Sequence, residues 1–114
     1  MPPRDWRMRI EDILQSIVTI QEYIQGMTFE NFARDRRTVD AVLRNITIIG
    51  EAASHVPPDV ADAHGEIPWK VMRDFRNVVV HAYFGIQLSI LWNTVQNDMP
   101  PLVVPLKQLL ERDA

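Results

Sequence analysis

Residues able to act on a phosphate group cluster within eight consecutive positions of this 114-residue chain. The run RNVVVHAY begins with Arg76 and Asn77, reaches His81 five positions after the arginine, and ends at Tyr83. A guanidinium presents forked N–H donors to phosphate oxygens, and an imidazole, with a pKa of about 6.5, can donate or accept a proton near neutrality. The run therefore indicates chemistry on a phosphodiester, with the amide and the phenol as additional hydrogen-bonding groups.

A helix is expected to position these residues. We predict it from about residue 67 to residue 82, with Pro68 in the first turn, where a missing N–H costs little. At about 100° per residue, one stripe of apolar side chains is predicted to face the core: Val71, Phe75, Val78, Val79 and Ala82. The polar side chains share the outward half of the same helix: Arg73, Arg76, Asn77, His81 and Tyr83.

The outward half of this helix has a geometry that matters for catalysis. Asn77 and His81 are i,i+4 neighbours, whereas Arg76 and His81 lie about 140° apart and converge only by flanking a common ligand or through distortion of the helix end. Two apolar residues, Val80 and Phe84, interrupt the polar face. They favour contact with another protein surface, and the simplest such partner is a second copy of the chain.

A dimer would solve a catalytic problem. Internal cleavage of RNA needs the 2′-hydroxyl deprotonated, the leaving 5′-oxygen protonated, and the charge of the pentacovalent phosphorane neutralised. One His81 cannot readily make both proton transfers in a single step. Two His81 side chains that face each other across a two-fold axis could serve as base and acid, with both Arg76 side chains on the phosphate.

Composition limits the other possibilities. With 46% hydrophobic residues, positions 1–114 are predicted to form one domain with a single core. The absence of cysteine removes disulfides and thiolate metal sites, and the formal net charge of −3 argues against an indiscriminate nucleic-acid binder. The sequence has no signal-peptide stretch and no run of about 18 apolar residues, so we expect a cytoplasmic protein without a membrane partner.

No metal ion or other cofactor is expected. The sequence has no HExxH motif, no two of its histidines share i,i+3 or i,i+4 spacing, and its carboxylates form no ligand-like cluster. We interpret His55 and His64 as incidental to the phosphodiester chemistry.

The rest of the chain also has helical periodicity. Asp5 and Thr28 are predicted N-caps, Gly26 and Gly85 are predicted stops, and residues 59–66 form a polar connector with a short helical turn. The remaining helices are predicted over these approximate ranges: 5–25, 28–34, 36–55, 87–97, and residue 102 onward. With no strand alternation, the predicted fold is an all-α, compact antiparallel bundle of about five helices.

The predicted helix over residues 36–55 carries a narrow polar stripe with two possible meanings. Its members recur every three or four residues: Arg36, Asp40, Arg44, Thr47, Glu51 and His55. They could form a solvated edge held by i,i+4 pairs such as Asp40 with Arg44, or the wall of a cleft that includes Asp40, Arg44 and Glu51. In the same helix, Gly50 predicts a close crossing with another helix, which would offset the cost of a glycine in a helix interior.

The phosphodiester-directed run and several other segments resemble a known family. RNVVVHAY is similar to the R-x4-H-x-Y signature of HepT-like toxins in the HEPN superfamily. Further matching segments are spread along the chain: residues 40–46, residues 48–52, Ile67-Pro68-Trp69, residues 83–86 and Leu91-Trp92. Because these segments are spaced and in order, the resemblance is more specific than a single motif, and it covers essentially the whole chain.

The resemblance implies a helical bundle that forms a homodimer, places its paired motifs in a basic cleft, and cleaves RNA as a metal-independent endoribonuclease toxin. It also implies a cognate antitoxin, a minimal nucleotidyltransferase of the MntA type, which inactivates the toxin by transferring AMP from ATP to the motif tyrosine. By position, Arg76 and His81 are the catalytic pair and Tyr83 is the site of AMPylation. Asn77 is the supporting polar residue, and Arg73, one turn earlier, is a second supporting candidate.

Two other interpretations stay open from the sequence. The chain could be a non-catalytic helical binding module that partners a nucleotidyltransferase or binds nucleotide. Alternatively, the run could have only a structural role, with Arg76 in a surface salt bridge near Asp74 or with Glu51, and with His81 bonded to a backbone carbonyl at the helix end.

Overall fold

The computed structural model describes residues 5–83 and 87–112, with side chains described except at residues 81–83. Within these ranges the chain consists of helices in the following order: α1 (Trp6–Ile24), α2 (Phe29–Arg34), α3 (Arg36–Ser54), α4 (Pro58–Ala63), α5 (Trp69–Tyr83), α6 (Leu88–Asn93), the π-helix η1 (Thr94–Asp98), the 3-10 helix η2 (Pro100–Leu102) and α7 (Val103–Arg112). The predicted all-α fold class is confirmed. None of these described helices combines the length and apolar character needed to cross a membrane.

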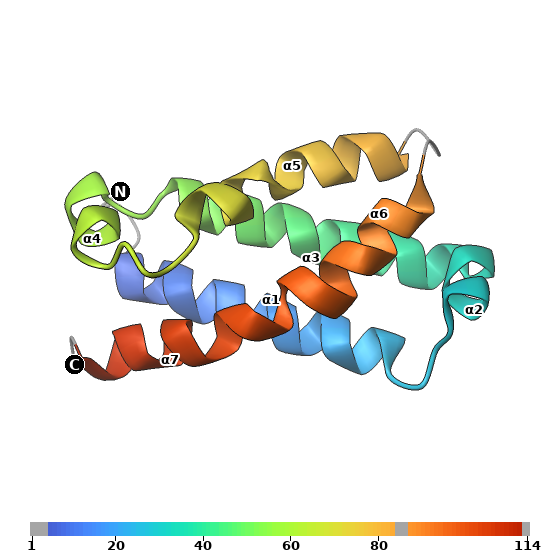
Figure 1. Cartoon of the computed structure of the whole chain (residues 1–114), viewed down its shortest axis with the longest axis horizontal. Coiled ribbons are helices and arrows are strands. Elements are labelled where there is room, and N and C mark those ends of the chain that lie inside the picture. Colours follow the sequence, from blue (N-terminus) through green and yellow to red (C-terminus); the bar gives the residue numbers. More distant parts are fainter. Residues whose placement is uncertain (1–4, 84–86, 113–114) are drawn as a thin grey trace.

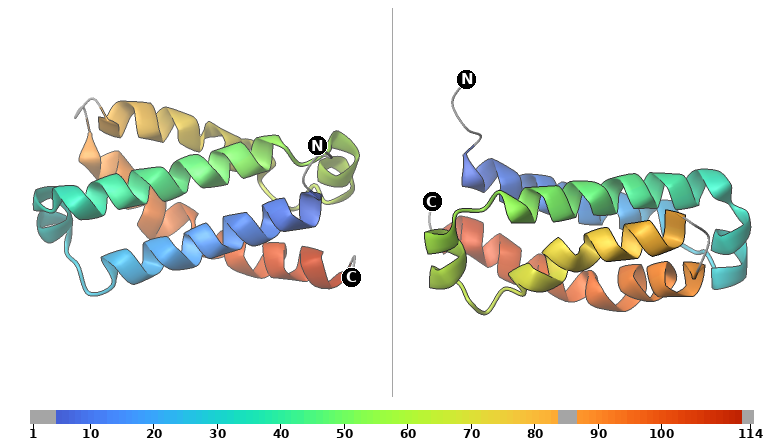
Figure 2. Two further views of the ribbon diagram at one scale, coloured as in Figure 1. Left: turned by 180° about the vertical axis from the view of Figure 1, so that it is seen from behind. Right: turned by 90° about the horizontal axis from the view of Figure 1, so that it is seen from above.

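The three longest helices lie side by side, with α3 between α1 and α5 (Figures 1 and 2). The run from α6 through α7 crosses the other side of this layer and ends beside α1 (Figure 1). The short helix α4 lies at the end of the bundle where α1 begins and α7 finishes, while α2 closes the opposite end (Figure 1). The motif helix α5 therefore has α3 as its main packing partner.

Local capping explains where the first three helices begin. The carboxylate of Asp5 accepts the backbone N–H of Arg7 at 2.9 Å, as predicted for an N-cap. Thr28 caps α2 in a reciprocal capping box with Asn31. Asp35 caps α3 by accepting the backbone N–H of Thr38 at 3.1 Å. Gly26, with φ of +77°, takes the left-handed conformation that lets the chain leave α1, which confirms the predicted stop.

The core follows from the apolar spacing of the helices. α1 contributes a ladder of isoleucines that are fully buried: Ile10, Ile13, Ile17 and Ile20. Each such burial stabilises the fold by about 1.5–3 kcal/mol relative to an exposed side chain. At the α2 end, Phe32 is fully buried and its ring lies 5.0 Å from that of Trp92, centroid to centroid, which joins α2 to α6.

The helix predicted over residues 87–97 is not a single α-helix. After α6 the backbone widens into η1, where the N–H of Met99 donates to the carbonyl of Thr94 at 3.2 Å, an i to i+5 bond. Pro100 and Pro101 follow directly, and neither can donate a backbone N–H to continue the ladder. The chain then passes through η2 into α7, so the prolines change the helix type instead of ending the helical run.

The buried stripe of α5 is rotated from its predicted position. Val71 was predicted to face the core but is 44% exposed, whereas Met72 is fully buried beside Phe75. Val78 and Val79 are half-buried against the core, as expected. The rotation arises because α5 packs on α3 through the Met72 side of the helix, a contact that periodicity within one helix does not specify.

Candidate functional site on the motif helix

The beginning of α5 is fixed by the indole of Trp69. This residue is only 6% exposed, and its Nε1–H donates to the carbonyl oxygens of Ala61 and His64, both at 3.1 Å. A guanidinium N–H of Arg112 in α7 donates to the Glu66 carboxylate at 3.1 Å, in the loop just before α5. The first turn of the motif helix is thus attached to the α4 end of the bundle, and the loop that leads into it is attached to α7.

The middle of α5 is fixed by its contact with Gly50 of α3. A Cβ placed on Gly50 would lie 3.4 Å from the carbonyl oxygen of Met72 and 3.5 Å from Cγ of Arg76. Gly50 is buried, and the backbones of the two helices approach closely at this point. The close helix crossing predicted from Gly50 is confirmed.

Arg76 is exposed, and no hydrogen bond or ion pair joins it to another described residue. The two carboxylates considered as structural partners bind elsewhere. Glu51 lies 3.4 Å from Nδ1 of His55, and Asp74 accepts from Nζ of Lys70 at 2.8 Å. The predicted alternative of a surface salt bridge for Arg76 is therefore wrong for the described part of the chain, and the guanidinium is available to an anion.

The other described residues of the outward half of α5 are exposed as predicted. Arg73 and Asn77 are exposed, and Val80 is 53% exposed on the same polar face. The helical backbone of α5 continues through His81 and Tyr83, so His81 lies about 7.5 Å along the axis from Arg76. The side chains of His81 and Tyr83, and Phe84 and Gly85 altogether, lie outside the described residues.

The polar stripe on α3 does not join the arginines of α5. Asp40 pairs with Arg36, Oδ1 to Nε at 3.3 Å, and not with Arg44 as predicted, because the carboxylate turns toward the first turn of the helix. Asp40 and Arg44 instead line a hollow of about 440 Å³ beside Tyr23 of α1. Glu51 pairs with His55 one turn later. Among the described residues, none of the three proposed as a cleft wall forms a hydrogen bond or an ion pair with Arg76.

One feature that the sequence did not predict is the environment of His64. Its side chain is 14% exposed, and its Nδ1 lies 3.8 Å from Oε1 of Glu66. The pKa of the Glu66 carboxyl is lowered, first by a hydrogen bond from its own backbone N–H and further by Arg112. His64 stands in an irregular loop, where no periodic pattern signals burial.

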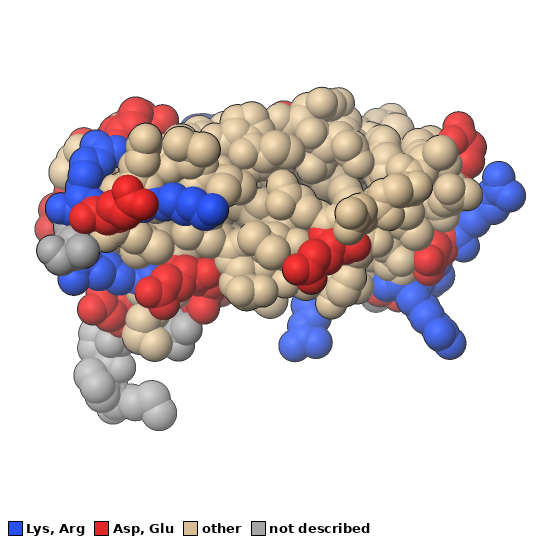
Figure 3. Space-filling model, turned by 90° about the horizontal axis from the view of Figure 1, so that it is seen from below, with Lys and Arg blue, Asp and Glu red and all other residues tan. Residues whose placement is uncertain are grey.

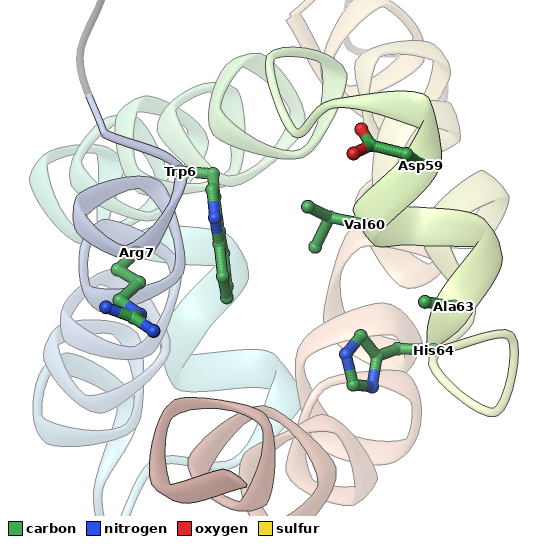
Figure 4. Close-up of a pocket in the computed structure, with 6 residues that line it drawn as sticks. All are labelled: Trp6, Arg7, Asp59, Val60, Ala63 and His64. Carbon is green, nitrogen blue, oxygen red and sulfur yellow. The ribbon is translucent and has the colours of Figure 1, made fainter. Parts of the chain in front are cut away.

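His64 also lines a hollow of about 310 Å³ at the α4 end of the bundle. Figure 4 shows Trp6 and Arg7 of α1 on one side of it, with Val60 of α4 and His64 on the other. No described side chain of the motif helix lines this hollow. Among the described residues, no group of three or more His, Asp or Glu side chains is arranged to hold a metal ion.

The distribution of charge along the chain is uneven. Positions 77–106 contain a single Asp, Glu, Lys or Arg residue, namely Asp98. In Figure 3, a broad uncharged area occupies the upper middle of the visible face, and charged side chains lie toward both ends and along the lower part. Large apolar side chains in this part of the chain are nevertheless exposed, with Ile90 at 40% and Val104 at 61%.

Comparison with known proteins identifies the family to which the chain is similar. The family described as Ribonuclease HepT-like matches residues 13–109. The probable ribonuclease HepT of Thermococcus cleftensis is 43% identical over 93 residues, 82% of this chain and 84% of that protein. A protein of Methanocaldococcus jannaschii, described as a candidate RNase, is 34% identical over 111 residues, 97% of this chain and 92% of that protein. No solved structure gives a significant match.

The fold and the geometry of α5 define a class: a small all-helical protein with an exposed arginine that no other described residue pairs on one helix face. The matches define the family within that class. The chain belongs to the HepT-like ribonucleases of the HEPN superfamily, which confirms the family predicted from the sequence.

Proposed function

We propose that this protein is a metal-independent endoribonuclease whose catalytic pair is Arg76 and His81. The observation that carries the proposal is the state of Arg76: exposed, without an ionic partner among the described residues, and on the same helix as His81. The membership of the chain in a ribonuclease family supports RNA as the substrate. An arginine that no carboxylate neutralises keeps its full charge for a phosphate.

The proposed reaction is an internal phosphoryl transfer. A neutral His81 removes the proton of a ribose 2′-hydroxyl, and the 2′-oxygen attacks the adjacent phosphorus. The bond from phosphorus to the 5′-oxygen breaks, and a protonated His81 supplies a proton to that leaving oxygen. The products are a 2′,3′-cyclic phosphate and a free 5′-hydroxyl, while Arg76 binds the phosphate oxygens as charge accumulates on the phosphorane. Asn77 and Arg73 are proposed to support His81 and the phosphate.

The two roles of histidine require two copies of the chain. We propose a homodimer in which the outward halves of α5 face each other and each copy contributes one His81. Val80, which is 53% exposed among polar neighbours on the outward half of α5, supports a protein contact on this face. The contact would bring both Arg76 side chains to one substrate phosphate.

We further propose that the activity is that of a toxin and that Tyr83 is its control point. A cognate nucleotidyltransferase antitoxin of the MntA type would transfer AMP from ATP to the phenol oxygen of Tyr83 and release pyrophosphate. Positions 76 and 83 are seven residues apart, which is almost two turns, so they fall on the same side of an ideal helix. AMP attached to Tyr83 would add an anionic phosphate and occupy the position of the substrate phosphate.

The decisive experiment uses purified protein on RNA in the presence of a chelator. The wild-type protein is expected to cleave, whereas His81→Ala and Arg76→Ala should each lose about 100-fold or more in rate. Equal cleavage by all three proteins would identify a contaminating nuclease and contradict the assignment. Failure of the wild type to cleave any RNA, together with stable binding to a nucleotidyltransferase, would instead indicate a binding module.

The dimer and the modification are tested separately. A strictly monomeric mass in solution at micromolar concentration would contradict the two-histidine mechanism. Co-expression with the proposed cognate nucleotidyltransferase should increase the intact mass by one or more AMP groups, and Tyr83→Phe should abolish that increase.

A further inference from the structure

The side chain of Arg76 is supported by a glycine of another helix. Cγ of Arg76 lies 3.5 Å from the position that a Cβ on Gly50 would occupy, so the aliphatic stem of the arginine lies over the bare backbone of α3. Gly50 is buried, whereas Arg76 as a whole is exposed. The stem therefore has a fixed neighbour on one side, and the guanidinium extends beyond it to the solvent.

We propose that Gly50 is a positioning residue for Arg76. Because position 50 carries no group that extends beyond a Cβ toward α5, α3 approaches α5 closely enough to support the arginine stem. This inference rests on the proposed function, in which the guanidinium of Arg76 binds the substrate phosphate. It adds a residue on α3, outside the motif, to the machinery that places the positive charge.

The physical reason is conformational entropy. An arginine loses much of its rotamer freedom when its guanidinium binds a ligand, and this loss opposes binding. A stem that already rests on α3 has fewer positions to lose, so phosphate binding becomes more favourable without a new contact to the ligand.

The contact distances predict which side chains position 50 accepts. A methyl group at Gly50 would be in ordinary van der Waals contact with the Met72 carbonyl at 3.4 Å and with the stem of Arg76. The two γ carbons of a valine extend beyond that methyl toward α5. They must displace the Arg76 stem or the backbone of α5, so Gly50→Val should disturb Arg76 more than Gly50→Ala does.

A matched control separates this effect from general overpacking. Ala52 is also in α3 and is 2% exposed, but it lies about 200° around the helix from Gly50, away from the α5 contact. Ala52→Val adds two γ carbons to a buried small residue, the same two that distinguish Gly50→Val from Gly50→Ala. It should cost stability without moving Arg76.

The first measurement is a double-mutant cycle on binding of a 2′-O-methyl RNA oligonucleotide, which cannot be cleaved through its 2′-oxygen. Gly50→Val is expected to weaken binding by about fivefold or more when Arg76 is present, and by less than about twofold in the Arg76→Ala background. Ala52→Val should change binding by less than about twofold in either background at an equal folded fraction. Equal losses from Gly50→Val in both backgrounds would overturn the inference.

The second measurement does not depend on RNA. Nuclear Overhauser contacts between the Gly50 Hα protons and the Arg76 side-chain methylenes are expected in the wild-type protein, and their absence would overturn the inference. If these contacts and the binding cycle are as expected but no RNA is cleaved, the proposed function fails while the positioning role stands. If cleavage occurs and the cycle shows no coupling, the positioning role fails alone.

Discussion

Gly50 and Met72 bring the backbones of α3 and α5 together. A Cβ on Gly50 would lie 3.4 Å from the Met72 carbonyl oxygen, which is an ordinary van der Waals contact distance. This crossing sets the rotation of α5, buries Met72 instead of Val71, and places Arg76 at the seam between the two helices. The orientation of the motif helix therefore depends on a residue outside the motif.

Gly50→Ala is expected to stabilise the protein. Alanine is favoured over glycine in a helix interior by about 0.5–1 kcal/mol, and at Gly50 the added methyl meets its neighbours at ordinary contact distances. The free energy of unfolding, measured by urea titration, should increase by about that amount. A decrease of similar size would mean that the helices are closer in solution than the structure indicates.

Arg76→Ala is expected to reduce RNA cleavage by about 100-fold or more while changing the free energy of unfolding by no more than about 0.5 kcal/mol. The reason is that the exposed guanidinium makes no hydrogen bond or ion pair with a described residue. Rates and urea titrations should be measured on the same preparation. Arg37→Ala, which removes another exposed arginine in the first turn of α3, is the matched control and should affect neither quantity. A large loss of stability in Arg76→Ala would favour a structural role.

Trp69→Phe is expected to destabilise the protein by about 1–2 kcal/mol beyond the loss of ring volume. Phenylalanine cannot donate to the carbonyls of Ala61 and His64, so both acceptors lose the indole N–H that holds α4 to the first turn of α5. Thermal and urea unfolding would measure the loss. Trp92→Phe is the comparison, because the half-buried Trp92 indole makes no hydrogen bond with a described residue. Equal losses in the two variants would show that the hydrogen bonds contribute little.

Asp35 gives α3 an acid-sensitive cap. The backbone N–H of Thr38 donates to its carboxylate at 3.1 Å, and this bond lowers the pKa of Asp35 in the folded state. The folded pKa of Asp35 lies below the unfolded value of about 3.9. The ionised cap therefore contributes its full stabilisation of the folded state above that value, and this stabilisation is lost as the pH falls through the folded pKa. Asp35→Ala should therefore lower the Tm by a few degrees at neutral pH, and the difference from wild type should shrink in strong acid.

A second variant isolates the charge of this cap. Asp35→Asn retains an oxygen that can accept the Thr38 N–H but does not titrate. Over the acid range, the Tm of Asp35→Asn should change less with pH than the Tm of the wild type does. Parallel Tm curves for Asp35→Asn and wild type would indicate that other carboxylates control the acid response.

Much of the fold was predictable because the signals are local. The apolar periodicity predicted α1, α2 and α3 to within one or two residues, and the caps at Asp5 and Thr28 follow from side chains that bond to a backbone N–H two or three residues away. The π-helix η1 was not predictable in this way. Its i to i+5 bond depends on how the Pro100-Pro101 pair is accommodated where η1 passes into η2 and α7.

For the site, the sequence by itself determined which chemical groups are available. It places an arginine and a histidine five positions apart on one helix, with a tyrosine after them. It also matches a ribonuclease family over residues 13–109. Only the tertiary structure decided which groups surround Arg76. It paired Glu51 with His55 and Asp74 with Lys70, left the guanidinium unpaired among the described residues, and put Gly50 beneath its stem. Periodicity specifies which side of a helix a residue occupies, but the partner on that side depends on the distance and rotation between helices, which arise from packing between distant segments.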